Sequence, residues 1–95
     1  MFIGGCLVHI DIPYSQSLKE KRAVVNSIKT KVSSKFNVSV AEVEYIDNKK
    51  KIGIGISMVS HSNNYIQSAF EKILNFINDN FDIIVLNEDF EIIKF

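Results

Sequence analysis

The feature that most constrains this fold is the order in which two hydrophobic periods alternate along the chain. A period of two, typical of a strand with one buried face, covers residues 2–12, 38–47, 52–58 and about 83–95. A period near 3.6, typical of an amphipathic helix, covers residues 18–35 and about 66–80. The expected order is therefore strand, helix, strand, strand, helix, strand. A chain of 95 residues has room for one such unit, so we expect a single domain over residues 1–95.

Several residues between these segments predict where the elements begin and end. Pro13 ends the first strand, because proline cannot donate to a central ladder. Ser17 and Glu20 have the spacing of a capping box and predict a helix that begins directly after the serine. Residues 47–51 form a polar turn that joins the second and third strands into a hairpin. Residues 87–89 interrupt the last strand and predict a bulge or bend there.

The arrangement that buries two amphipathic helices and four one-faced strands is an α+β, ferredoxin-like βαββαβ sandwich. Both helices then pack on one face of a four-stranded antiparallel sheet. Right-handed crossovers place the first and third strands at the centre of the sheet. The residues of these two strands expected to face the helices are Phe2, Cys6, Val8, Ile10, Ile12, Ile52, Ile54, Ile56 and Met58.

The opposite face of the two central strands carries few large side chains. Gly53, Gly55 and Ser57 leave this face flat, and Ile3 and Leu7 expose apolar side chains beside them. A flat apolar face permits the close approach of a second sheet. We therefore expect a homodimer whose interface includes these five residues.

The composition excludes several classes of site and compartment. A single cysteine, Cys6, cannot close an internal disulfide, so cytoplasmic location is the default expectation. His9 and His61 do not stand at metal-ligand spacing from other donors. No apolar run approaches the roughly 18 residues that a membrane helix needs. We expect no metal, no cofactor and no membrane.

The chemistries that this fold hosts elsewhere also lack their residues here. An acylphosphatase needs an arginine in the first loop, and a metallochaperone needs two cysteines around it. An RNA-recognition motif needs stacking aromatic residues on the open face of its central strands, where this chain has the small residues described above. Glu42 and Glu44 are expected to share one solvated face of the second strand rather than form an acid/base pair. The expectation is a protein that is not an enzyme.

The first predicted helix has an unusual charge distribution. Residues 17–35 carry six cationic side chains and one carboxylate, whereas the whole chain has a formal net charge of zero. Lys19, Lys21 and Arg22 lie near the helix N-terminus, where the helix dipole disfavours cations. Lys21 also falls in the apolar sector, so its stem should follow the core edge while its ammonium reaches water.

An anion near this helix start would offset the repulsion, and three sources remain open. In the first case no ligand is bound, and the cations are solvated or pair with acids of a second subunit. In the second case they bind RNA phosphates, and in the third they bind a small anion. The residues predicted to bind RNA or another anion are Ser15, Ser17, Lys19, Lys21, Arg22, Lys29 and Lys31.

Three stretches of the chain resemble the YlxP-like family of small bacterial proteins. They are Ser-Leu-Lys-Glu-Lys-Arg at residues 17–22, Phe-Asn-Val-Ser-Val-Ala-Glu-Val at 36–43, and Asp-Phe-Glu-Ile at 89–92. The resemblance implies a dimeric, ferredoxin-like domain of unknown function without established catalytic residues. The family's genes lie beside those of translation initiation and ribosome maturation factors, which implies a role near RNA or the ribosome. Phe90 stands where the family pattern has tyrosine.

The sequence thus leads to two functional hypotheses. The first is a non-enzymatic accessory protein that binds structured RNA or a ribosomal assembly intermediate through the basic first helix. The alternative is a regulatory module similar to amino-acid-binding ACT domains, with a small ligand held at a dimer interface.

Overall fold

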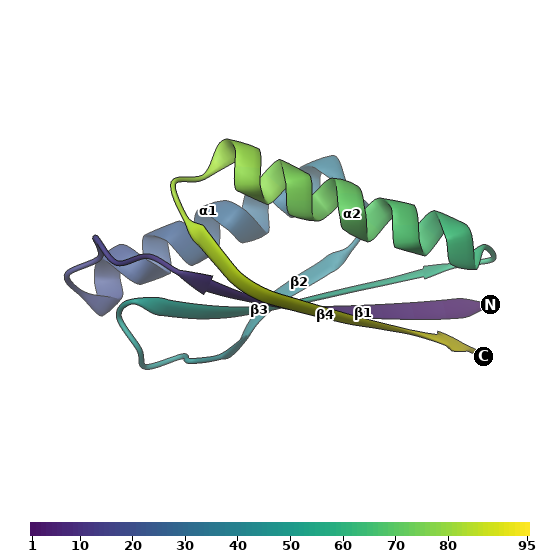
Figure 1. The fold of residues 1–95 in the computed structure, drawn as a ribbon, viewed down its shortest axis with the longest axis horizontal. Coiled ribbons are helices and arrows are strands. Elements are labelled where there is room, and N and C mark those ends of the chain that lie inside the picture. The colour runs from purple at the N-terminus through teal and green to yellow at the C-terminus, as the bar shows by residue number, and fades with distance from the viewer.

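The computed structural model describes all residues from Met1 to Phe95 and confirms the predicted order of elements. Figure 1 shows four strands beneath two helices. The elements in chain order are β1 (Phe2–Asp11), α1 (Leu18–Lys35), β2 (Ser39–Glu44), β3 (Lys51–Ser60), α2 (Asn63–Asn80) and β4 (Ile84–Lys94).

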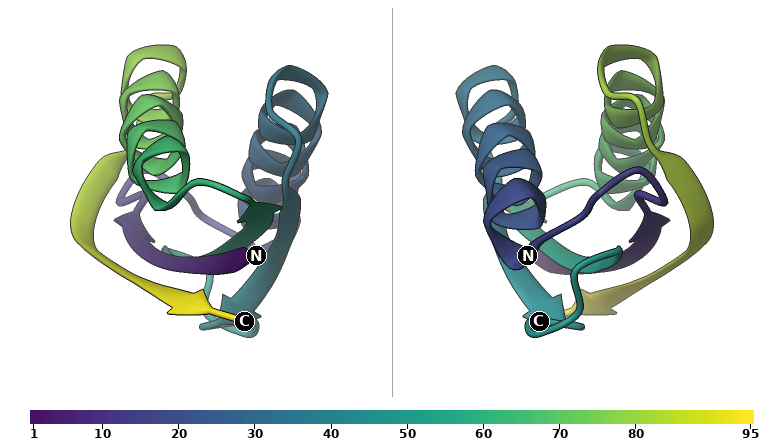
Figure 2. Two further views of the ribbon diagram at one scale, coloured as in Figure 1. Left: turned by 90° about the vertical axis from the view of Figure 1, so that its right-hand side faces the viewer. Right: turned by 90° about the vertical axis from the view of Figure 1, so that its left-hand side faces the viewer.

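The sheet has the strand order β2-β3-β1-β4, and all three pairings are antiparallel. This places β1 and β3 at the centre, as predicted from right-handed crossovers. Both helices lie side by side over one face of the sheet, and the other face carries no helix (Figure 2). The fold is therefore ferredoxin-like, and we call the uncovered side the open face.

The core fills the space between the helices and the sheet. Its sixteen buried apolar residues come from β1 with the turn after it, β3, α1 and α2. The predicted inward residues of β1 and β3 are buried, apart from the partly buried Phe2 at the edge of this core. Gly4 allows the close approach of α2, because a Cβ there would lie 2.5 Å from Ile66 Cγ2 and 3.0 Å from the Phe70 ring.

Serine side chains cap both helices. At α1 the Ser17 hydroxyl accepts a hydrogen bond from the Glu20 amide at 3.1 Å, as the capping box predicts. The Glu20 carboxylate, however, accepts from the Gln16 amide at 2.8 Å and not from the amide of the cap residue. At α2 the Ser62 hydroxyl accepts from the Tyr65 amide at 3.2 Å, and the helix begins three residues before its first predicted apolar position.

Two bulges interrupt the edge strands. The register of β4 on β1 shifts between His9 and Ile10, so Leu86 is the extra residue, one position before the predicted irregularity. The register of β2 on β3 shifts between Glu42 and Glu44, so Val43 is the extra residue there. This second bulge ends β2 at Glu44, earlier than the alternating sequence pattern predicts.

Candidate functional site

Lys21 differs most from its sequence-based expectation. The expected snorkelling is wrong, because its side chain is fully buried. Its ammonium donates to Glu42 Oε2 at 2.7 Å and to the carbonyls of Tyr45 and Ile46 at 2.8 and 3.0 Å. All three ammonium donors therefore have protein acceptors, and Lys21 cannot contact a ligand in this conformation.

Lys50 makes a second link between the same two parts of the chain. Its ammonium donates to the carbonyls of Pro13 and Ser15 at 2.6 and 2.9 Å, in the loop between β1 and α1. Lys21 of α1 thus binds backbone carbonyls of the hairpin, and Lys50 of the hairpin binds backbone carbonyls of the loop that precedes α1. The β2–β3 hairpin is held against the start of α1, at the end of the molecule opposite the two chain termini (Figure 1).

The other residues predicted to bind an anion are not brought together in one patch. Ser15 is buried, and its hydroxyl donates to the Ser17 carbonyl at 3.2 Å. Lys31 lies with its ammonium 5.2 Å from the centre of the Phe81 ring, on the side of α1 that faces α2. Lys29 lies on the same face of α1 as Arg22, two helical turns farther along the helix.

Two of the predicted binding residues remain free at the start of α1. Lys19 and Arg22 are exposed, and neither makes an ion pair. The hairpin adds Lys49 and Lys51, which sequence analysis assigned only to a turn. The run of three lysines at residues 49–51 was the signal for them. Lys50 binds the loop before α1, whereas Lys51 lies on the open face beside Tyr45.

The bulge in β2 corrects the prediction that Glu42 and Glu44 share a solvated face. Glu42 faces α1 and binds Lys21, whereas Glu44 lies on the open face. Glu44 Oε1 is 2.8 Å from His9 Nε2. Gly53 lies opposite both residues, and a Cβ there would come within 2.6 Å of Glu44 Cβ. A glycine is therefore needed for Glu44 to cross β3 and reach His9.

Tyr45 follows this bulge and completes a small polar and aromatic group on the open face. Its ring packs edge-on against His9, with centroids 5.6 Å apart and an interplanar angle of 67°. The Lys51 ammonium lies 5.8 Å from the centre of the Tyr45 ring. We call His9, Glu44, Tyr45 and Lys51 the Tyr45 cluster.

Tyr45 has an unusual backbone for a residue with a side chain. Its φ of 59° places it in the left-handed region, and no other non-glycine residue of the chain has a positive φ. The two Lys21 hydrogen bonds to the carbonyls of residues 45 and 46 hold this conformation. The cluster is thus fixed by α1 through the hairpin backbone.

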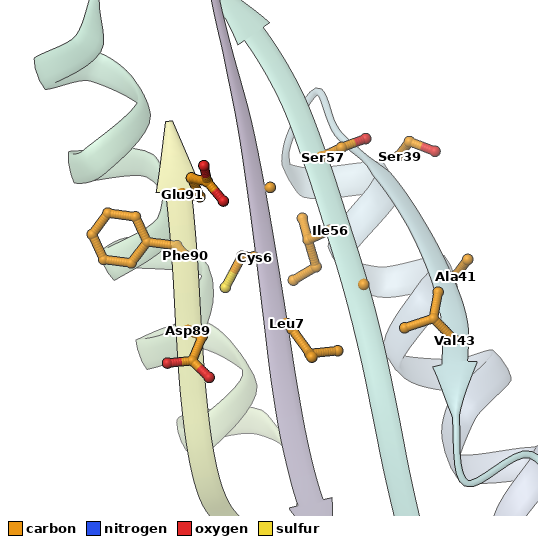
Figure 3. Close-up of a pocket in the computed structure, with 12 residues that line it drawn as sticks. Cys6, Leu7, Ser39, Ala41, Val43, Ile56, Ser57, Asp89, Phe90 and Glu91 are labelled. Atoms are coloured by element: carbon orange, nitrogen blue, oxygen red, sulfur yellow. The ribbon is translucent and has the colours of Figure 1, made fainter. Parts of the chain in front are cut away.

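A shallow hollow of about 600 Å³ lies farther along the open face. Figure 3 shows Leu7 and Val43 at one end of it, with Asp89 and Glu91 of β4 along one side. Gly5 belongs to its floor, where a Cβ would meet no atom within 4 Å.

The five residues predicted for a dimer interface all belong to this open face. Three of them place side chains on it, and the two glycines contribute only backbone. Ile3 and Leu7 are half-buried, and Ser57 is exposed. The face is less bare than predicted, because Glu44 covers Gly53 and Val43 lies over Gly55. A partner sheet would therefore meet these two side chains of β2 as well.

The edge strand β4 forms an acidic flank. Glu88, Asp89 and Glu91 make no ion pair. Burial first, and then the charges of Glu88 and Asp89, raise the pKa of the Cys6 thiol to about 11. Cys6 is therefore a protonated core residue at neutral pH.

No group of three or more histidine, cysteine, aspartate or glutamate side chains is placed to hold a metal ion. Neither helix is both long enough and apolar enough to cross a bilayer.

Comparison with known proteins supports the family and the fold. The chain matches the family described as "Protein of unknown function (DUF503)" over residues 3–90. It is 44% identical over 62 residues to "Uncharacterized protein YlxP" of Bacillus subtilis (strain 168), covering 65% of this chain and 67% of that relative.

A solved structure resembles the fold at much lower sequence identity. It is a crystal structure described as a "Putative Chlorite dismutase", and it superposes with a TM-score of 0.55 at 7% identity. The match covers 97% of this chain but 44% of the other, so the chain spans less than half of that protein's length. At this identity the likeness concerns the fold alone.

Proposed function

The chain belongs to the DUF503 family of unknown function, and from that starting point we propose that it is a non-enzymatic accessory protein that binds structured RNA. The RNA would belong to a ribosomal assembly intermediate in the cytoplasm. The proposed contact surface is the exposed start of α1 with the adjoining hairpin, at Lys19, Arg22, Lys49 and Lys51.

The observation that carries this proposal is the separation of unpaired charges on the molecule. Lys19 and Arg22 are free at the start of α1, while the unpaired carboxylates of β4 lie at the far edge of the sheet. A neutral chain with its charges divided in this way can orient toward a polyanion. The helix dipole disfavours cations at this position, and phosphates would offset the repulsion.

Charge-removing variants at the start of α1 test the proposal. Lys19→Gln with Arg22→Gln should weaken binding to purified ribosomal subunits or to a structured RNA hairpin. The slope of log affinity against log salt should fall by about 0.7 to 0.9 for each phosphate that the variant no longer neutralises. Lys94→Gln is the matched control, because Lys94 lies on β4 beside the chain termini. Unchanged affinity and slope in the double variant would contradict the proposed surface.

A second candidate rests on the hollow of the open face. Its volume lies within the range of about 300 to 1,000 Å³ seen for small-molecule sites. Ile3 lies directly between Val59 and Ile93 in the strand register, and both neighbours are more than half exposed. Two copies that stack through this apolar row would enclose the hollow, as an ACT-like regulatory dimer requires.

The dimer and its ligand can be tested separately from RNA. Light scattering at tens of micromolar should give a dimeric mass for the wild type and a lower mass for Leu7→Lys, which places a charge on the open face. A ligand in the hollow should raise the melting temperature of the wild type. A monomeric wild type would remove this candidate and leave the RNA proposal untouched.

A further inference from the structure

We propose that the Tyr45 cluster is a stacking site for one unpaired base of the bound RNA. This inference rests on the proposed RNA binding and deepens it, because it names a base contact in addition to the phosphate contacts. Sequence-tolerant recognition of unpaired bases commonly uses aromatic side chains beside cations.

The first support is the accessibility of the Tyr45 ring. The Tyr45 residue is 43% exposed even though its ring contacts His9 and the Lys51 ammonium lies over it at 5.8 Å from the ring centre. A stacked base would use the part of the ring that these two side chains leave exposed. It lies on the open face, where no helix covers it. The loss of conformational freedom on binding is small, because tyrosine has two side-chain torsions and His9 already limits them.

The second support is the fixed position of the Tyr45 backbone. Its left-handed φ of 59° is unfavourable for a residue with a Cβ. The buried ammonium of Lys21 nevertheless holds the carbonyl of Tyr45 at 2.8 Å and that of Ile46 at 3.0 Å. Strained backbone held by its surroundings is often found at ligand contacts. Here it turns Tyr45 toward His9 and Lys51.

The third support is the continuity between this ring and the proposed phosphate contacts. The Tyr45 carbonyl is bound by Lys21, and Arg22 is the next residue of α1. Lys51, one of the proposed phosphate contacts, lies 5.8 Å from the ring centre. An RNA segment whose base stacks on Tyr45 would therefore have a cation beside that base. Structured RNA offers such bases in loops and bulges.

The competing interpretation is that Tyr45 only packs the hairpin against His9. The two interpretations differ in which RNA is affected when the ring is removed. A stacking site discriminates between RNA with an unpaired base and a fully paired duplex. A packing role would change stability and would weaken binding to both RNAs alike.

The experiment measures affinities for two RNA probes of equal length. One is a hairpin with an adenine-rich loop, and the other is a fully paired duplex. Tyr45→Leu should weaken loop binding about 5- to 150-fold, the range expected when one base stack is removed. Its duplex affinity and its salt slope should remain those of the wild type. Tyr45→Phe keeps the ring and should bind the loop as the wild type does.

Tyr65→Leu is the matched control, because Tyr65 is 60% exposed in the first turn of α2, at the end of the molecule that holds the chain termini. It should leave both affinities unchanged. In the wild type, titration with the loop RNA should shift the NMR signals of the Tyr45 ring and of His9.

The possible failures are distinguishable. Unchanged loop affinity in Tyr45→Leu, with normal wild-type binding, would overturn the stacking site and leave the proposed function standing. Equal losses for loop and duplex, with a lower melting temperature, would assign Tyr45 a packing role and also overturn it. A wild type that binds neither RNA would refute both proposals.

Discussion

Replacing Lys21 by methionine removes the ammonium that joins α1 to the hairpin. The variant keeps most of the apolar stem but leaves Glu42 without its cation and the Ile46 carbonyl without this donor, whereas the Tyr45 carbonyl still accepts from the Asn48 amide at 2.9 Å. Breaking a buried ion pair by removing one partner typically costs about 3 to 5 kcal/mol. The Glu42 side chain is 15% exposed and can recover some hydration, so we expect a loss near the lower end, about 3 kcal/mol.

A loss of this size is a large part of the stability of a small domain, which is about 5 to 15 kcal/mol. For a chain of 95 residues it corresponds to a fall in melting temperature of about 12 to 24 °C. Thermal and urea unfolding followed by circular dichroism would measure it. Lys19→Met is the matched control, since Lys19 is exposed and its loss should change stability by less than about 0.5 kcal/mol.

A double variant separates the unpaired charge from the lost packing. Lys21→Met combined with Glu42→Leu removes both charges, and apolar replacement of a whole buried pair is often neutral or stabilising. The double variant should therefore regain more than half of the lost stability, because no unpaired carboxylate remains and the Tyr45 carbonyl keeps the Asn48 amide as its donor. If Lys21→Met melts within about 2 °C of the wild type, the ammonium does not have the buried role assigned to it.

Two further predictions concern β1. Gly4→Ala should destabilise the fold by about 1 to 3 kcal/mol, because its Cβ would collide with Ile66. Gly5→Ala should be neutral or slightly stabilising, because its Cβ would meet no atom within 4 Å. Thermal melts of the two variants should show this difference. The pKa of Cys6 is raised to about 11, so the contribution of this thiol to the free energy of unfolding should be fully present below pH 9. It should fall as the pH rises from 9 to 11, where the unfolded chain loses the thiol proton first. Urea unfolding over this pH range would show the fall, and Cys6→Ala should have a smaller one.

The fold could be predicted because each element carries a local signal. The apolar alternation of β1 and β3 and the Ser17 cap of α1 depend only on neighbouring residues, and the structure confirms all three. The buried state of Lys21 has no such signal. Helical periodicity places it in the apolar sector, but the acceptors that permit its burial come from residues 21 to 25 positions away.

The bulge in β2 limits the prediction of the candidate site. Alternation places Glu42 and Glu44 on one face, and a single extra residue, Val43, moves Glu44 to the other. A shift of one residue inverts every later side chain of a strand. By itself this inversion would turn Tyr45 away from the open face, but Tyr45 has a left-handed φ of 59° and is found beside His9. Sequence reasoning considered stacking aromatic residues only on the two central strands and did not anticipate this position. Gly53 reads in the sequence as part of a bare surface, and only the structure shows that Glu44 covers it.

The acidic flank of β4 also affects whether this edge of the sheet can pair with another strand. β4 is an edge strand of eleven residues with half-exposed Leu86 and Phe90, and such edges can pair with other strands and aggregate. If two β4 strands paired antiparallel about Phe90, Asp89 of each copy would face Glu91 of the other, with like charges directly opposed. These carboxylates therefore disfavour that pairing and act against continuous sheet growth at this edge.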